Sequence, residues 1–312
     1  MSERRDLTAQ IAANKRRTVY VMTGFVLFVA AVAAAFDAAF AGGPIVIGVA
    51  VVVALVMVWG SYFHSDKLAI AASHAVEADP DQYRQYHNLV EGLCLGIGLP
   101  KPRLYVVDDP APNAFATGRN AEHAAIAVTT GLLAIMNRAE LEGVLAHELS
   151  HIANDDILIG TIAVTLVGFM ALLSDFGLRL LIFGRNGNRR RNDGGTQIYI
   201  MAFSLVFLVL APVAAKAMQF AISRRREALA DVSGVLITRN PDGLIAALVK
   251  LRDNPAIIAH APAATAHLWI ESPLDPESRG VHGWFNRLFQ THPPIQSRID
   301  TLREAAGLAR AA

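Results

Sequence analysis

The chain has 312 residues, of which 53% are hydrophobic and 18% are charged, and its formal net charge is +1. An ordinary soluble domain has about 25% charged residues, so this chain is too apolar for one, although its length would allow about two domains. A net charge near zero argues against a nucleic-acid partner. The single cysteine, Cys94, excludes an intrachain disulfide and is expected to be a buried, inert thiol.

The N-terminal part is predicted to form a helical hairpin through a membrane. Apolar stretches at residues 19–36 and 45–63 follow a polar start that ends in three basic residues. Each stretch is close to the ~20 residues that a bilayer requires. A cleaved signal peptide is not favoured, because the first stretch is too long and a second follows at once. The positive-inside rule keeps the basic N-terminus in the cytoplasm, so the chain after the hairpin is also expected there.

A small sheet is predicted next. Residues 65–98 are predicted to form two helices joined near Pro80. Residues 103–107, 113–118 and 124–130 then have the short apolar or β-branched character of strands, with a turn between the last two. A sheet is therefore expected before residue 137.

Residues 140–156, ELEGVLAHELSHIANDD, are predicted to be helical. Asn137 is a suitable N-cap, and Glu140 follows three residues later, as in a capping box. Apolar residues recur at helical spacing after it; they are Leu141, Val144, Leu145, Leu149 and Ile152.

This helix carries the pattern H-E-x-x-H. His147 and His151 are four residues apart, so on a helix both imidazoles can reach one metal ion. Zinc suits nitrogen ligands, and a catalytic zinc takes three protein groups and a water. Glu148 stands where a carboxylate can accept the proton of that water. The alternative is a chance match on a buried helix, because such motifs give false positives.

Two further apolar stretches lie within residues 157–215, separated by a polar loop at residues 184–196. They are predicted to form a second hairpin, with buried core helices as the alternative that hydropathy does not exclude. A spanning hairpin would place an arginine-rich tip on the far side, against the positive-inside rule. Whether this hairpin fully spans the bilayer therefore stays open.

The third metal ligand is sought on a later helix. The extended motif H-E-x-x-H-x-x-G-x-x-H is excluded, because Asn154 and Ile157 stand at its glycine and histidine positions. A helix predicted over residues 216–240 supplies Glu227, with Asp231 one turn further on. Asp231 could accept a hydrogen bond from a ligand imidazole and fix its tautomer. The alternative is that Glu227 pairs with Arg224 or Arg225 on a solvated helix face.

The remainder is predicted to hold a short helix at residues 244–252, a loop region at 253–283 and a last helix at 295–308. The last helix follows the sequence Thr291, His292, Pro293.

Several segments in order resemble the HtpX-type membrane zinc metalloproteases, bacterial heat-shock proteases related to the CAAX prenyl proteases. The segments are LPKPRLYVVDDPAPNAFATGR, AAIAVTTGLL, ELEGVLAHELSHIANDDIL, SRRREALAD and THPPIQSRI, and the resemblance covers nearly the whole chain. Only four apolar stretches are present, which favours the HtpX branch.

The resemblance implies a mainly α fold, with membrane helical hairpins and a zincin-like (gluzincin) α+β metallopeptidase domain that contains a small sheet. The expected divisions are residues 1–66 for the tail and first hairpin, 67–156 for the first part of the peptidase domain, 157–215 for the second hairpin and 216–312 for the rest of the peptidase domain.

The resemblance also implies roles for individual residues. One zinc ion per chain is expected on His147, His151 and Glu227, with Glu148 as the general base. His292 is expected near the site, where it would assist the transition state. Asp231 and Asp156 are expected only in supporting roles around the metal. An unpaired edge strand is expected to hold the substrate backbone; its residues are Asn113, Ala114, Phe115 and Ala116.

The implied function is a membrane-bound zinc metalloendopeptidase that cuts internal bonds of misfolded or damaged membrane proteins. Its expected place is the bacterial inner membrane, with the active site facing the cytoplasm and a role in quality control under stress. The expected partners are membrane-protein substrates and the lipid bilayer, and no nucleic acid. The alternative is an adaptor or scaffold of this fold that binds clients without cutting them.

Overall fold

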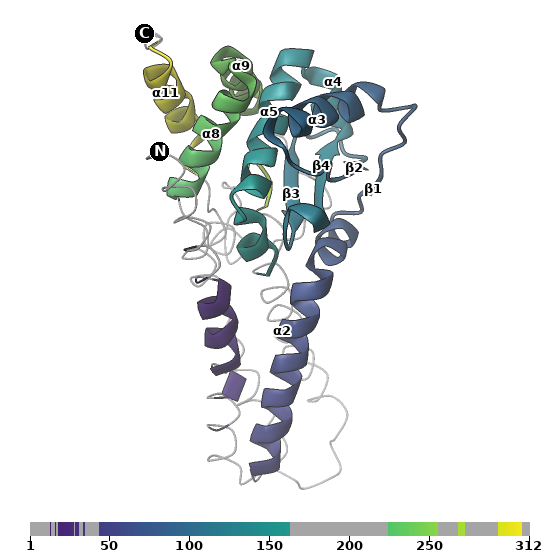
Figure 1. Cartoon of the computed structure of the whole chain (residues 1–312), viewed down its shortest axis with the longest axis vertical. Helices are drawn as coiled ribbons and strands as arrows, with labels where there is room; N and C mark the ends of the chain where they lie inside the picture. The colour runs from purple at the N-terminus through teal and green to yellow at the C-terminus, as the bar shows by residue number, and fades with distance from the viewer. Residues whose placement is uncertain are drawn as a thin grey trace, which may run out of the picture.

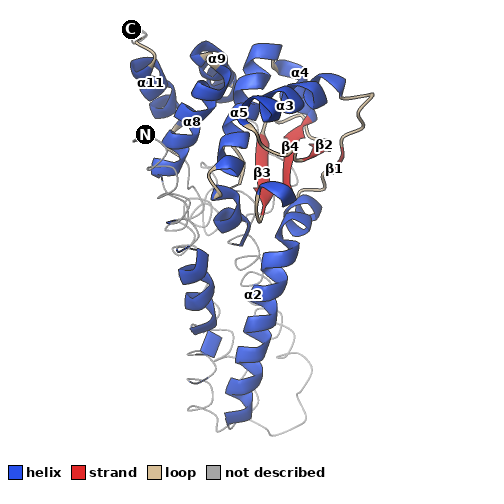
Figure 2. Cartoon of the chain, viewed as in Figure 1, coloured by secondary structure: helices blue, strands red, loops and turns tan. Residues whose placement is uncertain are grey.

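The computed structural model describes residues 18–27, 44–162, 224–254, 268–271 and 293–307, with a few single positions before residue 35 (Figure 1). The described part is mainly helical and holds one small mixed sheet (Figure 2). The helices α3 and α5 pack on the sheet, α8 and α9 pack against α5, and α2 extends away from the sheet. Most of the predicted second hairpin and His292 lie outside the described residues.

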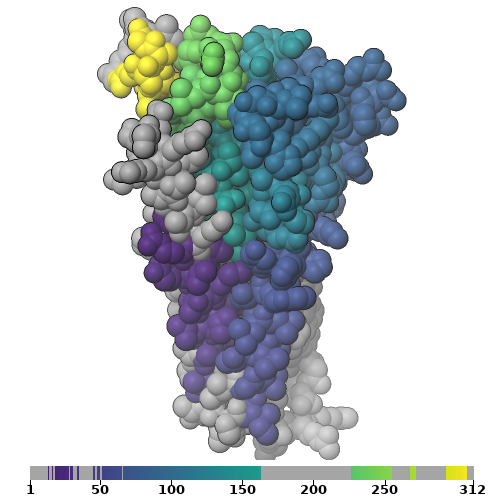
Figure 3. All heavy atoms as spheres, viewed as in Figure 1, coloured from purple at the N-terminus to yellow at the C-terminus, as the bar shows by residue number. Residues whose placement is uncertain are grey.

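Helix α2, Pro44–Ala72, is a single helix of 29 residues. The prediction that the apolar stretch ends near residue 63 and a new helix begins at 65 is wrong. The change to polar residues such as Asp66 and Lys67 reflects different surroundings along one continuous helix. The helix does not break there, because no proline interrupts it. In the space-filling view the N-terminal residues lie against α2, where Met22 lines a groove with Trp59 (Figure 3). Among the described residues, none of the helices is both sufficiently long and sufficiently apolar for a membrane crossing.

The sheet has the order β1-β2-β4-β3. Its strands are β1 (Val76–Glu77), β2 (Arg103–Val107), β3 (Ala114–Gly118) and β4 (Ala124–Thr129). The last two pair antiparallel, whereas β2 and β4 are parallel. The three predicted strands are confirmed, and β1 was missed because two residues carry no periodicity. Helix α3, Arg84–Ile97, precedes β2 and ends at Gly98, whose φ of 71° is left-handed.

Both faces of β3 and β4 are buried, which explains why these strands are continuous apolar runs. The larger core packs α3, α5 and α9 against one face. On the other face, Ala69 and Ile70 of α2 pack with Phe115 and the wholly buried Trp269. The end of α2 is therefore joined to the strand next to the H-E-x-x-H helix.

Helix α5, Arg138–Ala153, begins with the predicted capping box. The Asn137 side chain accepts a hydrogen bond from the Glu140 amide at 3.0 Å, and the Glu140 carboxylate accepts one from the Asn137 amide at 2.7 Å. Lys250 adds an ion pair to the same carboxylate at 2.7 Å. Capping and this ion pair fix where α5 begins, and so fix the turn on which each motif residue lies.

Three helices follow the part of the chain that the structure leaves out. They are α8 (Arg224–Thr238), α9 (Pro241–Asp253) and α11 (Ile295–Ala305). Helix α9 approaches α5 so closely that a Cβ at Gly143 would lie 2.7 Å from the backbone nitrogen of Leu244. All three helices were predicted, with bounds a few residues different.

Residues 268–271 lie along β3, so the expected unpaired edge is absent over most of its length. Trp269 forms an antiparallel bridge with Phe115, and the amide of Ile270 donates to the carbonyl of Ala114 at 2.9 Å. The Asn113 side-chain amide donates to the carbonyl of Glu271 at 2.9 Å, and its side-chain oxygen accepts a hydrogen bond from the Glu271 amide at 3.3 Å. The expectation of an open edge is therefore wrong for Asn113, Ala114 and Phe115.

Ala116 is covered by the same segment. Because the amide of Thr129 in β4 donates to Asn113, every second residue of β3 turns its backbone groups away from β4. Of these residues, Ala114 bonds Ile270 and Gly118 bonds the Thr161 hydroxyl at 3.3 Å. Ala116 lies between them and faces Leu268, next to the bridge between Phe115 and Trp269, so the expectation of an open edge is wrong for this residue too.

Candidate active site

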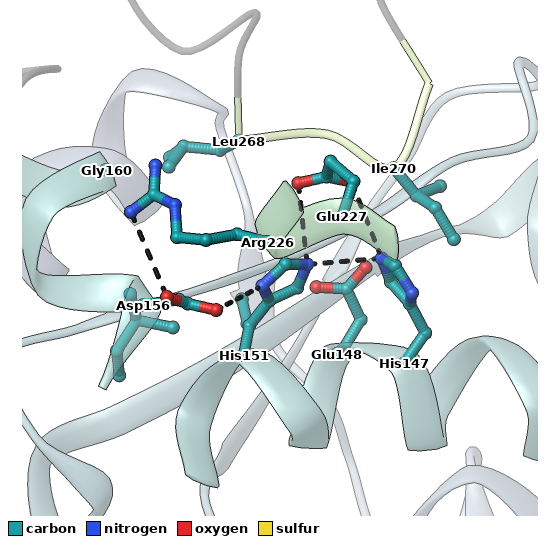
Figure 4. Close-up of a pocket in the computed structure, with 11 residues that line it drawn as sticks. His147, Glu148, His151, Asp156, Gly160, Arg226, Glu227, Leu268 and Ile270 are labelled. Carbon is teal, nitrogen blue, oxygen red and sulfur yellow. Dashed lines mark hydrogen bonds and ion pairs between the residues drawn. The ribbon is translucent and has the colours of Figure 1, made fainter. Parts of the chain in front are cut away.

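The three expected ligands come together from two helices. His147 and His151 lie on one face of α5, and Glu227 lies in the first turn of α8, which packs across that face (Figure 4). Their ligand atoms all lie within 4.8 Å of one another. The two imidazole Nε2 atoms are 3.2 Å apart, and the Glu227 oxygens lie 3.9 and 3.8 Å from them. The predicted grouping of these residues is confirmed.

Each histidine has a carboxylate at its other ring nitrogen. Asp231 lies 2.9 Å from Nδ1 of His147, and Asp156 lies 3.4 Å from Nδ1 of His151. An Nδ1–H donated to a carboxylate leaves the lone pair on Nε2, and two such lone pairs here face each other beside an anionic Glu227. That arrangement repels unless a proton or a metal cation lies between the groups. Two imidazoles and one carboxylate fit zinc, which takes three protein ligands in a catalytic site.

The protonation of the two imidazoles differs in the metal-free site. Burial lowers the pKa of His147 to about 4, and the nearby Arg298 charge acts in the same direction. His147 is therefore neutral at pH 7, as a metal ligand must be. Burial also opposes the protonation of His151, but the Asp156 hydrogen bond and the Glu227 charge outweigh it and raise that pKa to about 9. The raised pKa of His151 thus reflects a local excess of negative charge, which a bound cation would neutralise.

Glu148 is buried and shares a pocket with these groups. In Figure 4 its carboxylate points from α5 to the same side as the two imidazoles. The cavity volume is about 50 Å³, and its walls combine these polar groups with apolar ones; the lining includes Ala116, Ile157, Gly160, Leu268 and Ile270. Such a site can place a carboxylate base beside an ion and a small bound molecule.

Glu227 is buried, so it does not lie on the solvated helix face that the alternative requires. Its carboxylate faces the imidazoles of His147 and His151. The neighbouring Arg226 turns toward Asp156 instead, with 3.9 Å between the charged atoms.

One residue of the site was missed. Arg298 on α11 is 3% exposed and binds both oxygens of Asp231, at 2.9 and 2.6 Å. It lies in the segment THPPIQSRI, but the local sequence carries no signal for a partner so far away. The only available signal was the general rule that a buried arginine needs a carboxylate partner.

Comparisons with known proteins agree with this site. The model for peptidase family M48 matches residues 80–306. The protease HtpX homolog of Limosilactobacillus fermentum is 42% identical over 303 residues, which cover 96% of this chain and 99% of the relative. The Streptococcus gordonii homolog is 41% identical over 301 residues, with 96% and 99% covered. The Tropheryma whipplei homolog is 46% identical over 243 residues, with 78% and 80% covered.

Among solved structures, the crystal structure of S. mikatae Ste24p aligns with a TM-score of 0.49 and 16% identity, over 95% of this chain and 66% of that one. The family match spans most of the chain and includes every residue of the metal cluster. The chain is therefore a zinc metalloprotease that belongs to peptidase family M48.

Proposed function

We propose that this protein is a membrane-bound endopeptidase in which His147, His151 and Glu227 hold zinc and Glu148 is the general base. The observation that carries this proposal is the grouping of three ligand atoms within 4.8 Å, with a fourth carboxylate in the same pocket. When bound there, zinc lowers the pKa of a coordinated water and polarises the scissile carbonyl.

Glu148 accepts the proton of the attacking water and returns it to the leaving amine. Its burial among apolar walls keeps bulk water from competing for that proton. Asp231 and Asp156 hold the two imidazoles in the tautomer that leaves Nε2 free to bind. A non-cleaving adaptor would have no use for a carboxylate at the position of Glu148.

The substrate backbone is proposed to pair with β3 at Ala116. Its amide and carbonyl turn away from β4 toward Leu268, so an extended peptide that pairs there by β-augmentation would take the place of Leu268. Ile270 bounds the same pocket, so the peptide lies between this side chain and the ligands. Because only one residue of the peptide would pair with the strand, any preference for substrate sequence would come from the apolar walls of the pocket.

Membrane attachment is proposed from the surface of α2. Large apolar side chains stand exposed along this helix, in the stretch that the sequence predicts to lie in lipid; they include Val49, Val52, Val56 and Trp59. Exposed apolar surface of this extent marks a contact with lipid or with a partner. Substrates would then be membrane proteins, with the site on the cytoplasmic side of the bacterial inner membrane. A protein that stays in the soluble fraction after cell lysis would contradict this attachment.

The catalytic proposal is tested by purifying the parent chain and Glu148→Gln with zinc. The parent should hydrolyse casein and lose that activity with a chelator. The variant should contain as much zinc as the parent and be inactive. Equal activity of the two proteins would remove Glu148 from the mechanism.

A further inference from the structure

Arg298 forms two of its hydrogen bonds with Asp231. Nε donates to one carboxylate oxygen at 2.9 Å and Nη2 donates to the other at 2.6 Å, which is the bidentate fork that only arginine can form. Asp231 in turn faces Nδ1 of His147 at 2.9 Å. Three residues on three helices, α11, α8 and α5, therefore form a continuous path to one zinc ligand.

The same guanidinium also reaches the segment that covers β3. Its Nη1 donates to the carbonyl of Ile270 at 3.0 Å, and the amide of Ile270 donates to Ala114. Next to Ile270, Trp269 packs edge-to-face on Phe115 with ring centroids 4.6 Å apart. Residues 268–271 are thus held on the Ala114 side by the strand and on the other side by Arg298.

Arg298 also contacts the ring of His147 directly. Its Nη2 lies 3.5 Å from Nδ1 and 3.4 Å from Nε2. These distances are long for hydrogen bonds, whereas Asp231 is within 2.9 Å of both Arg298 and His147, so the stronger contact of Arg298 with the metal site passes through Asp231.

A purely stabilising role explains this arrangement poorly. Burying an ion pair costs desolvation, and apolar replacements of such pairs are often neutral or stabilising. The donors of Arg298 go to Asp231, which contacts the proposed ligand His147, and to the carbonyl of Ile270, which bounds the pocket. A buried arginine with these two partners can position both of them.

We propose that Arg298 is a positioning residue that acts in two directions. Through Asp231 it orients His147 for zinc, and through the carbonyl of Ile270 it fixes the wall that bounds the substrate cleft. The second action rests on the proposed peptidase function, whereas the first concerns metal binding alone.

The test is a double-mutant cycle of Arg298→Lys and Asp231→Asn in the full chain. Lysine keeps the charge but cannot hold both carboxylate oxygens and the carbonyl of Ile270 at once. Zinc affinity is measured on metal-free protein by competition with a chelator, and KM and kcat are measured with an internally quenched peptide. Arg84→Lys, at an exposed arginine of α3 that pairs with Asp81, is the matched control.

Arg298→Lys should weaken zinc binding by about 10–100-fold, as is typical when the partner of a ligand is disturbed. In the Asp231→Asn background it should weaken zinc binding no further, because the path to His147 is already broken. It should raise KM in both backgrounds, since the contact with Ile270 does not depend on Asp231. Arg84→Lys should match the parent in every measurement.

Three results would overturn the proposal. A lower melting temperature with parental zinc affinity and KM would leave Arg298 a merely structural role. Additive losses of zinc affinity in the double variant would show that Arg298 does not act through Asp231. A lower KM would show that residues 268–271 block the cleft instead of bounding it.

A parent chain that binds zinc but cuts no peptide would refute the peptidase function, and the zinc measurements would still decide the first action of Arg298.

Discussion

Gly234 of α8 lies against the backbone of His147. A Cβ at Gly234 would be 3.1 Å from the amide nitrogen of His147 and 3.2 Å from its Cα. These neighbours are backbone atoms of a proposed zinc ligand, and they cannot turn aside as a flexible side chain could. The absence of a side chain at this position is what lets α8 bring Glu227 and Asp231 to α5.

Gly234→Ala should therefore weaken zinc binding even though alanine favours a helix by about 1 kcal/mol over glycine. We expect α8 to move by a few tenths of an ångström and zinc affinity to fall measurably in a chelator competition. Gly92→Ala in α3 is the control, because a Cβ there meets nothing within 4 Å. It should raise the melting temperature and leave zinc binding unchanged. Tighter zinc binding in Gly234→Ala would show that the helix contact does not limit the site.

Glu148→Gln should keep zinc and lose hydrolysis. A neutral amide cannot accept the proton of the attacking water, and general acid–base catalysis contributes typically 10²–10⁴-fold, so kcat should fall by about that factor. The measurement is peptide turnover beside zinc content for each preparation. Loss of zinc together with activity would mean that Glu148 supports the metal site itself.

Glu227→Ala should lower zinc affinity more than Asp231→Ala does. The first change removes a ligand, whereas loss of a residue that only orients a ligand typically costs about 10–100-fold. Both residues are buried, so both variants are compared with the parent for melting temperature in the metal-free state. If the two variants retain zinc equally under a competing chelator, Glu227 is not a ligand.

Ala116→Pro should reduce activity with zinc retained. Proline removes one backbone donor, and at Ala116 that donor points away from β4 toward Leu268, so the ladder between the two strands keeps its bonds. We expect a higher KM for peptides longer than a few residues and unchanged zinc content. Unaltered turnover in a correctly folded variant would exclude pairing at this position.

Cys94 should resist alkylation in the folded protein. Burial raises the pKa of its thiol to about 11, as expected from the apolar run around it. At pH 8 about one thiol in a thousand is then ionised, and only the thiolate reacts. Iodoacetamide labelling followed by mass spectrometry should be slow in native protein and fast in denaturant. Rapid labelling of native protein would show that α3 opens readily.

Local patterns in the sequence were enough for the strands and for α5. β2, β3 and β4 are short apolar runs between turn residues, and Asn137 with Glu140 marks a helix start by chemistry that needs no tertiary contact. The end of α2 was misplaced because a change in hydropathy was taken for a break in the helix. Its true extent depends on how Ala69 and Ile70 pack on the sheet.

Long-range contacts account for what was missed at the site. The bond between Asn113 and Glu271 joins residues 158 positions apart, and residues 253–283 have the composition of a loop. Arg298 and Asp231 are 67 positions apart on different helices. The metal residues were found because His147 and His151 share one helix and a later predicted helix offers Glu227 with Asp231 one turn on; the family resemblance then supported Glu227 as the third ligand. Any role of His292 stays a prediction.

Helix α2 is one rod from its apolar end to the sheet. At about 1.5 Å per residue its 29 residues span roughly 43 Å. Its last turns pack on Phe115 and Trp269, which belong to the strand and the segment that border the metal pocket. A change in the angle of the helix would therefore be passed to β3 and to residues 268–271, which border the metal pocket, so the surroundings of the distal end of α2 bear on the geometry of the site.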